Sequence, residues 1–157
     1  MAMLHQCSIK KMLRGGGTHR FTLEKPEHTV SLGKALAAVL KGGDAVLLSG
    51  ELGAGKTVLT KGIALGLGIT APVVSPTFTI MNEYPTGGVK LCHFDAYRLA
   101  DADEARSAGL TDFIGNPECI CAVEWWQNIS PLFEGLHTVS VKIEKTGDNS
   151  REVEITL

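Results

Sequence analysis

The sequence predicts an α/β fold of three layers, in which a mixed, mostly parallel sheet lies between helices. A continuous apolar run of strand length, residues 45–48, leads directly into a glycine-rich loop and then into a helix-patterned segment. Such uninterrupted apolar strands are typical of sheets that are buried on both faces. Two β-rich pairs joined by short turns, within residues 77–95 and 138–156, add antiparallel strands to this parallel core.

The first half of the chain alternates between strand and helix signals. Residues 20–23 are expected to form a strand, and Thr29 or Ser31 is expected to cap a helix that stops at Gly42-Gly43. The apolar strand 45–48 follows. Residues 56–67 then carry Leu, Ile and Leu at helical spacing, with glycines near the end as stop signals.

The second half predicts mostly strands. Their expected ranges are 77–84 and 89–95, a hairpin across the turn 85–88; 120–123, a buried strand; and 138–144 with 152–156, a closing antiparallel pair. A short acidic helix is expected over residues 101–107.

Length and composition favour one soluble domain. The chain has 157 residues, 44% of them hydrophobic, which suffices to bury a single core. No apolar run reaches the roughly 18 to 20 residues of a membrane span, so no membrane contact is expected. Residues 1–17 are interpreted as a tail, either disordered or a cloning remnant or a weak targeting segment, and residues 18–157 as the domain.

The charge distribution disfavours direct binding of nucleic acid. The chain has 15 basic and 17 acidic side chains, and four of the basic ones precede residue 21, where no acidic residue occurs. The remaining part is therefore acidic. A domain that clamps nucleic acid alone normally carries a basic stripe, so any contact with RNA is expected to be indirect.

The four cysteines, at positions 7, 92, 119 and 121, lack the spacing of a metal site. Most of them lie in or beside apolar runs. Buried free thiols in a reducing cytoplasm are the favoured interpretation.

Residues 50–57 match the P-loop pattern G-x-x-x-x-G-K-T. Phosphate oxygens need several donors without bulky side chains nearby, and the glycines let backbone N–H groups turn inward. Lys56 supplies positive charge, and Thr57 offers a hydroxyl to Mg²⁺. The expected ATP-binding residues are Gly50, Glu51, Leu52, Gly53, Ala54, Gly55, Lys56 and Thr57.

The alternative to a phosphate site is a glycine turn with an exposed lysine, and the flanking strand and helix disfavour it. Adenine is favoured over guanine because no N-K-x-D segment follows.

Two carboxylates are candidates for metal binding and hydrolysis. Asp95 and Glu124 each follow a buried strand, so both are expected at the sheet edge that carries the loops. The alternative is that each is simply solvated, which the nearby P-loop disfavours.

Other residues are candidates for sensing the nucleotide. Ser75 and Thr77 lie shortly after the loop helix, where nucleotide switches place a hydroxyl near the γ-phosphate and metal. His93 is a candidate proton carrier or, alternatively, a packed core residue. Trp125 is expected to stack on the base or ribose, although both Trp125 and Trp126 could instead cover the core or contact a partner.

Three segments together resemble one family: GELGAGKT at 50–57, SPTFTI at 75–80 with Tyr84, and HFDAYRL at 93–99, followed by Glu124-Trp125. It is the bacterial tRNA threonylcarbamoyladenosine biosynthesis ATPase family, called TsaE or YjeE, and the resemblance spans about residues 20–145. One departure is Trp126, where members of the family commonly have proline.

The resemblance implies a weak, partner-dependent ATPase. Its implied partners are a threonylcarbamoyl transferase subunit and the paralogous partner of that subunit, of the TsaD and TsaB types, which modify the adenosine beside the anticodon of certain tRNAs. By the same resemblance, Lys56 binds phosphates, Thr57 and Glu124 serve Mg²⁺, and Asp95 belongs to the region needed for hydrolysis. Residues 75–78 and 93–98, the latter including His93 and Arg98, correspond to its two switch segments.

Two other functions stay open at the level of sequence. A small-molecule kinase uses the same loop but needs lid arginines, and the chain has only five scattered ones. A nucleotide-controlled binding module, in which ATP occupancy orders residues 75–78 and hydrolysis is incidental, is the other.

Overall fold

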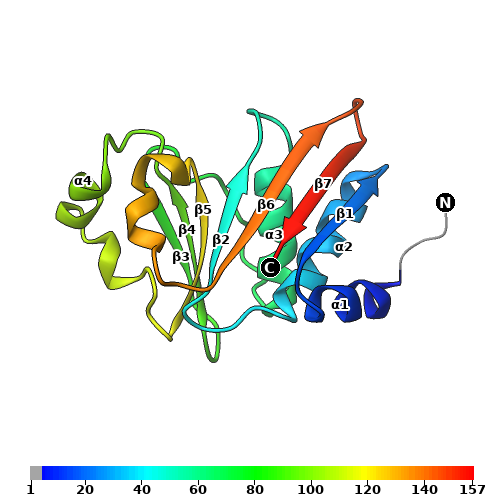
Figure 1. The fold of residues 1–157 in the computed structure, drawn as a ribbon, viewed down its shortest axis with the longest axis horizontal. Helices are drawn as coiled ribbons and strands as arrows, with labels where there is room; N and C mark the ends of the chain where they lie inside the picture. Colours follow the sequence, from blue (N-terminus) through cyan, green and yellow to red (C-terminus); the bar gives the residue numbers. More distant parts are fainter. Residues whose placement is uncertain (1–4) are drawn as a thin grey trace.

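The computed structural model describes residues 5–157 and shows a seven-stranded sheet with helices on both faces (Figure 1). The strand order is β1-β7-β6-β2-β5-β4-β3. The strands are β1 Thr18–Leu23, β2 Ala45–Ser49, β3 Met81–Tyr84, β4 Lys90–Asp95, β5 Cys119–Glu124, β6 Thr138–Lys145 and β7 Arg151–Thr156. Strands β6, β2, β5 and β4 run parallel, whereas the pairs β1-β7, β7-β6 and β4-β3 are antiparallel. The predicted mixed sheet is confirmed.

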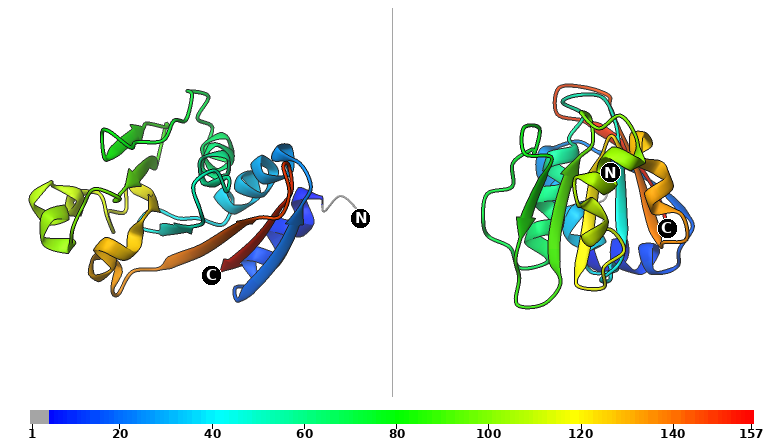
Figure 2. Two further views of the ribbon diagram at one scale, coloured as in Figure 1. Left: turned by 90° about the horizontal axis from the view of Figure 1, so that it is seen from above. Right: turned by 90° about the vertical axis from the view of Figure 1, so that its left-hand side faces the viewer.

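Helices form a layer on each face of this sheet (Figure 2). One layer holds α1 Gln6–Arg14, α2 Pro26–Ala37 and α3 Lys56–Gly66; the other holds α4 Ala102–Ser107 and the 3₁₀ helices η1 Leu110–Asp112 and η2 Trp126–Phe133. Alternate residues of β2 face opposite cores: Val46 and Leu48 pack with the first layer, and Ala45 and Leu47 with the second. None of the helices within residues 5–157 has the length and apolar character that crossing a membrane requires.

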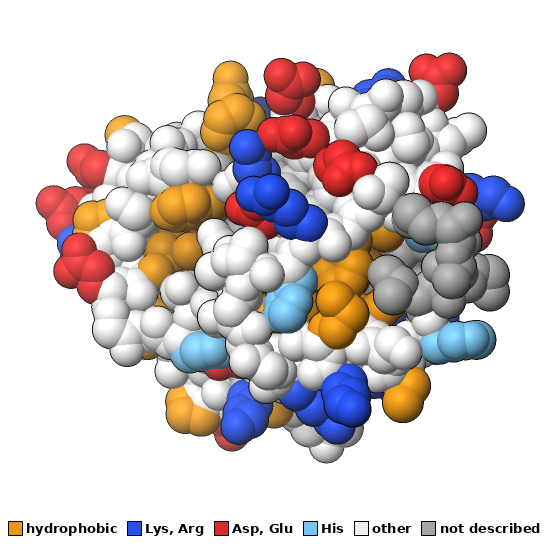
Figure 3. Space-filling model, turned by 45° about the vertical axis from the view of Figure 1, so that its right-hand side comes forward, with side chains coloured by type: hydrophobic (Ala, Val, Ile, Leu, Met, Phe, Trp, Pro, Cys, Tyr) orange, Lys and Arg blue, Asp and Glu red, His pale blue; other side chains and the backbone are white. Residues whose placement is uncertain are grey.

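At the end of the sheet formed by β1, β7 and β6, one face is polar and is covered by none of the helices within residues 5–157. On β6, Val139, Val141 and Ile143 are buried against the first layer, and the residues between them are exposed. A shallow depression of about 270 Å³ on the open face is lined by Arg20, Lys142, Glu144, Glu152, Val153 and Glu154. Basic and acidic side chains intermingle over this side of the molecule (Figure 3).

Helix α2 begins earlier than the sequence predicts. Its N-cap is Lys25 and Pro26 is its first residue, so neither Thr29 nor Ser31 caps it. Proline suits the first helical turn because its fixed φ is helical and its missing N–H would lack a partner there. The helix also ends at Ala37, before the predicted stop at Gly42-Gly43.

Residues 6–14 of the segment interpreted as a tail are helical, so the disordered alternative does not hold for them. These residues form α1, whose Ile9 and Leu13 are buried in the core that α2 and α3 share. The two side chains are four residues apart and so lie on one face of the helix. Residues 1–4 of the same tail lie outside the described residues.

The cysteine prediction is confirmed for three of the four positions. Cys92, Cys119 and Cys121 are buried free thiols on β4 and β5, whereas Cys7 is exposed on α1. Burial raises the pKa of the Cys119 thiol to about 11, because the thiolate is poorly solvated there.

Helices α2 and α3 approach each other closely through glycines. A Cβ atom on Gly33 would lie 2.8 Å from the Cα atom of Gly62, and one on Gly62 would overlap the carbonyl oxygen of Val30. This contact positions α3, the helix that follows the glycine loop.

We predict that Gly62→Ala destabilises the protein by roughly 1–3 kcal/mol, because the added methyl group meets rigid backbone atoms. Without this overlap, alanine would stabilise the helix by about 1 kcal/mol relative to glycine. Urea unfolding followed by circular dichroism measures the difference. Gly87→Ala is the control, since a Cβ atom there has open space around it. A Gly62→Ala protein at least as stable as the unmodified chain would contradict the prediction.

Candidate nucleotide site

The glycine loop connects the end of β2 to the start of α3, at the carboxyl edge of the parallel strands. Gly50, Gly53 and Gly55 have φ values of 155°, 80° and 113°, which favour glycine. A Cβ atom on Gly50 would lie 2.6 Å from the carbonyl oxygen of Ile143 in β6. The predicted order of strand, loop and helix is confirmed, and the side chain of Leu52 in this loop is fully exposed.

Lys56 is the first residue of α3 and is nearly buried. Its Nζ atom donates a hydrogen bond of 2.7 Å to the carbonyl oxygen of Gly50 and lies 3.8 Å from Oε1 of Glu124. The same ammonium group lies 5.4 Å from the centre of the Trp125 ring, within the range of a cation–π contact. The lysine therefore bends back over the loop.

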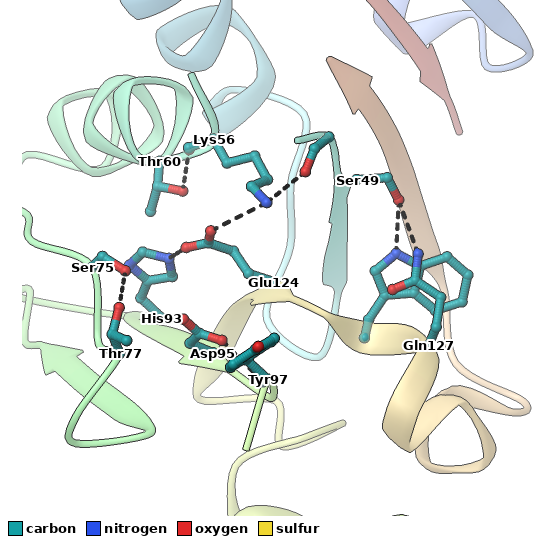
Figure 4. A network of polar contacts seen from close by, with 12 residues as sticks. Ser49, Lys56, Thr60, Ser75, Thr77, His93, Asp95, Tyr97, Glu124 and Gln127 are labelled. Carbon is teal, nitrogen blue, oxygen red and sulfur yellow. Dashed lines mark hydrogen bonds and ion pairs between the residues drawn. The ribbon is translucent and has the colours of Figure 1, made fainter. Parts of the chain in front are cut away.

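Glu124 connects Lys56 to His93 at the centre of the site (Figure 4). His93 Nε2 donates to Oε2 of Glu124 over 2.7 Å, which places the proton of the ring on Nε2 when the histidine is neutral. His93 is completely buried, and its Nδ1 atom has no hydrogen-bond partner among the described residues. This geometry fits a residue that orients Glu124 and is itself closed off from solvent.

Asp95 lies beside Glu124 at the same sheet edge. The two residues are register partners at the ends of β4 and β5, and Glu124 is also the register partner of Leu48 in β2. Oδ1 of Asp95 accepts a hydrogen bond from the backbone N–H of Tyr97. The structure thus brings both predicted carboxylates to the strand ends next to the glycine loop.

The two predicted switch segments contact each other. The Arg98 guanidinium lies 5.0 Å from the centre of the Phe78 ring, and the backbone N–H of Asp95 donates to the carbonyl oxygen of Ile80, two residues beyond the first segment. Ile80 has a φ of 67°, a strained conformation for a β-branched residue. Ser75 Oγ and Thr77 Oγ1 are hydrogen-bonded to each other at 3.0 Å.

The two tryptophans have separate surroundings. The Trp125 ring lies 5.1 Å from the Tyr97 ring and beside Lys56, and it lines a hollow of about 290 Å³ with Ser49 and Gly50. Trp126 Nε1 donates to Ser49 Oγ over 3.0 Å. Ser49 is not predicted from the sequence, because no local pattern signals a contact between residues 77 positions apart.

The donor set fits Mg²⁺ bound together with phosphates. Within residues 5–157, no group of three or more His, Cys, Asp or Glu side chains is arranged to hold a metal alone. Mg²⁺ commonly uses one or two carboxylates, waters and substrate phosphates rather than a cage of protein ligands. The half-buried Thr57 in the first turn of α3, with Asp95 and Glu124, offers such a set.

Comparisons with known proteins agree with this architecture. The sequence model described as "Threonylcarbamoyl adenosine biosynthesis protein TsaE" matches residues 23–153. The chain is 43% identical over 131 residues to the tRNA threonylcarbamoyladenosine biosynthesis protein TsaE of Bacillus subtilis, covering 83% of this chain and 80% of the relative. It is 39% identical over 152 residues to the protein of the same name from Nostoc sp., covering 95% and 91%.

A solved structure is similar as well. The crystal structure of YdiB from Bacillus subtilis superposes with a TM-score of 0.67 at 38% sequence identity, covering 90% of this chain and 86% of that one. The glycine loop, the two carboxylates at the strand ends and these matches lead to one conclusion: the chain belongs to the TsaE family of threonylcarbamoyl adenosine biosynthesis proteins.

Proposed function

We propose that this chain is a Mg²⁺-dependent ATPase that supports the threonylcarbamoyl modification of tRNA adenosine next to the anticodon. The observation that carries the proposal is the convergence of the glycine loop, Lys56, Asp95 and Glu124 at one edge of the sheet. The names of the relatives supply the pathway. The site of action is the cytoplasm, where tRNA is modified.

Each residue of the site has a distinct proposed task. The loop backbone N–H groups and Lys56 bind the phosphates, and the Thr57 hydroxyl and Glu124 hold Mg²⁺, which neutralises charge on the phosphates when bound. Within residues 5–157 the Asp95 carboxylate accepts one hydrogen bond, from a backbone N–H, whereas the Glu124 carboxylate contacts both Lys56 and His93. Asp95 is therefore the carboxylate with the greater freedom to orient the attacking water, and His93 keeps Glu124 in place. Trp125, beside Lys56, is proposed to flank the nucleotide.

Partner dependence is supported by apolar side chains exposed around the site. Leu52, Phe78, Tyr97 and Trp125 are 100%, 84%, 60% and 43% exposed. Large apolar groups exposed together are typical of protein contacts. The proposed partners are the threonylcarbamoyl transferase subunit and its paralogous partner, of the TsaD and TsaB types, which hold the tRNA. The excess of acidic residues beyond position 20 supports an indirect role for tRNA.

A binding module controlled by nucleotide occupancy is the second candidate. It is favoured by the strained backbone at Ile80, between the Ser75–Thr77 hydroxyl pair and Asp95, because a strained segment can change conformation when a ligand binds. The two candidates differ only in whether turnover matters.

Lys56 provides a test of phosphate binding at the loop. ATP hydrolysis should be slow for the protein alone and faster with the two partner subunits, and Lys56→Ala should reduce the stimulated rate by about 100-fold through loss of phosphate stabilisation. Phosphate release is the measurement. Lys61→Ala is the matched control, because Lys61 is exposed on the same helix. Equal rates for the two variants would exclude Lys56 from the site.

A substitution at Asp95 separates the need for hydrolysis from the need for ATP occupancy. Asp95→Asn should retain ATP binding within about threefold but lose about 100-fold in hydrolysis, because an amide is a poor base and orients water less well. Nucleotide titration, phosphate release and tRNA modification are measured on the same protein. Asp103→Asn is the control, since Asp103 pairs with Arg106 on the surface. Full modification without hydrolysis would favour the binding module.

A further inference from the structure

Arg151 is the first residue of β7 and contacts the outer side of the glycine loop. Its Nε atom donates a hydrogen bond of 2.6 Å to the carbonyl oxygen of Ala54, and its Nη2 atom lies 3.4 Å from the carbonyl oxygen of Gly53. The Nη1 atom donates to carbonyl oxygens of the β6–β7 turn, at 3.0 Å to Gly147 and 2.8 Å to Ser150. One guanidinium therefore joins two loops that lie far apart in the sequence.

The guanidinium of Arg151 bonds to backbone carbonyl oxygens and forms no ion pair with a carboxylate within residues 5–157. By contrast, Arg20 on the neighbouring strand β1 pairs with Glu154 at 2.7 Å. A positive charge without a partner, held against a loop that binds anions, favours phosphate at that loop.

Peptide geometry links this contact to the donors of the loop. In a planar trans peptide the C=O and N–H groups point in opposite directions. The carbonyl of Ala54 points to Arg151, so the N–H of Gly55, which belongs to the same peptide, points away from it. The N–H of Ala54, in the peptide whose carbonyl is that of Gly53, already donates to the carbonyl oxygen of Glu51 at 3.0 Å. Arg151 thus fixes the direction of a donor that is left for a ligand.

We propose that Arg151 is a positioning residue of the nucleotide site: by holding the carbonyls of Gly53 and Ala54, it directs the Gly55 N–H to the β-phosphate and adds unpaired positive charge. This inference rests on the nucleotide binding proposed above. The plain structural alternative is that Arg151 only anchors the β6–β7 turn. That alternative predicts a loss of stability without a selective loss of nucleotide affinity.

The test compares three variants of the full chain: Arg151→Ala, Arg151→Lys and the control Arg20→Ala. The affinity for ADP is measured by isothermal titration calorimetry, the melting temperature by circular dichroism, and the ADP-induced shift of the Gly55 amide by ¹⁵N NMR. Arg151→Ala should weaken ADP binding by about tenfold and reduce the Gly55 shift, because charged hydrogen bonds are lost. Arg20→Ala removes the same charge from the same sheet and should change ADP affinity less than twofold.

Arg151→Lys keeps the charge, but a single ammonium group cannot bond to both loops as the guanidinium does. The lysine variant should therefore recover only part of the ADP affinity. This variant decides the test if Arg151→Ala does not fold: ADP affinity equal to that of the unmodified chain would overturn the positioning role. Equal ADP affinity for Arg151→Ala and Arg20→Ala would overturn the inference and leave the proposed function intact. No ADP or ATP binding by the unmodified chain would overturn both.

Discussion

Parallel pairing of β2, β5 and β4 brings three strand ends to one edge of the sheet, and the site depends on this constraint. Because the three strands run in the same direction and in register, Glu124 lies beside Leu48, and Asp95 lies beside Glu124. The glycine loop starts two residues after Leu48. Asp95, Glu124 and the glycine loop are distant in sequence, and the sheet itself brings them together. The β6 strand completes the arrangement, since its Ile143 carbonyl leaves room only for glycine at position 50.

Glu124 is the electrostatic centre of that edge. Burying an unpaired carboxylate would cost several kcal/mol, on the order of the stability of a small domain. Lys56 and His93 offset this cost from two sides, so the three side chains depend on one another. This arrangement also explains the fully buried His93 on β4. The histidine bonds to Oε2 of Glu124, and Oε1 is left facing Lys56.

The features that the sequence predicts well are those whose signals are local. The loop and its helix follow from the G-x-x-x-x-G-K-T pattern, and the hairpin and closing pair follow from short turns between β-rich runs. Helix α1 was missed although Ile9 and Leu13 carry helical spacing, because its stability comes from burial against α2, which a short segment does not reveal. The contacts of Arg151 with Ala54 and of Trp126 with Ser49 join residues 97 and 77 positions apart. No local pattern encodes them.

The hydrogen bond from Lys56 to the Gly50 carbonyl bears on how tightly a nucleotide is held. A phosphate group that takes over this ammonium replaces an existing bond of 2.7 Å and competes with Glu124 for the same charge. Binding is therefore an exchange of partners, and its net gain is smaller than the attraction between a free lysine and a phosphate. Under the proposed function, the lysine would return to these partners, the Gly50 carbonyl and Glu124, when the product leaves. Under the proposed ATPase function, such a site would favour turnover over retention of the bound nucleotide.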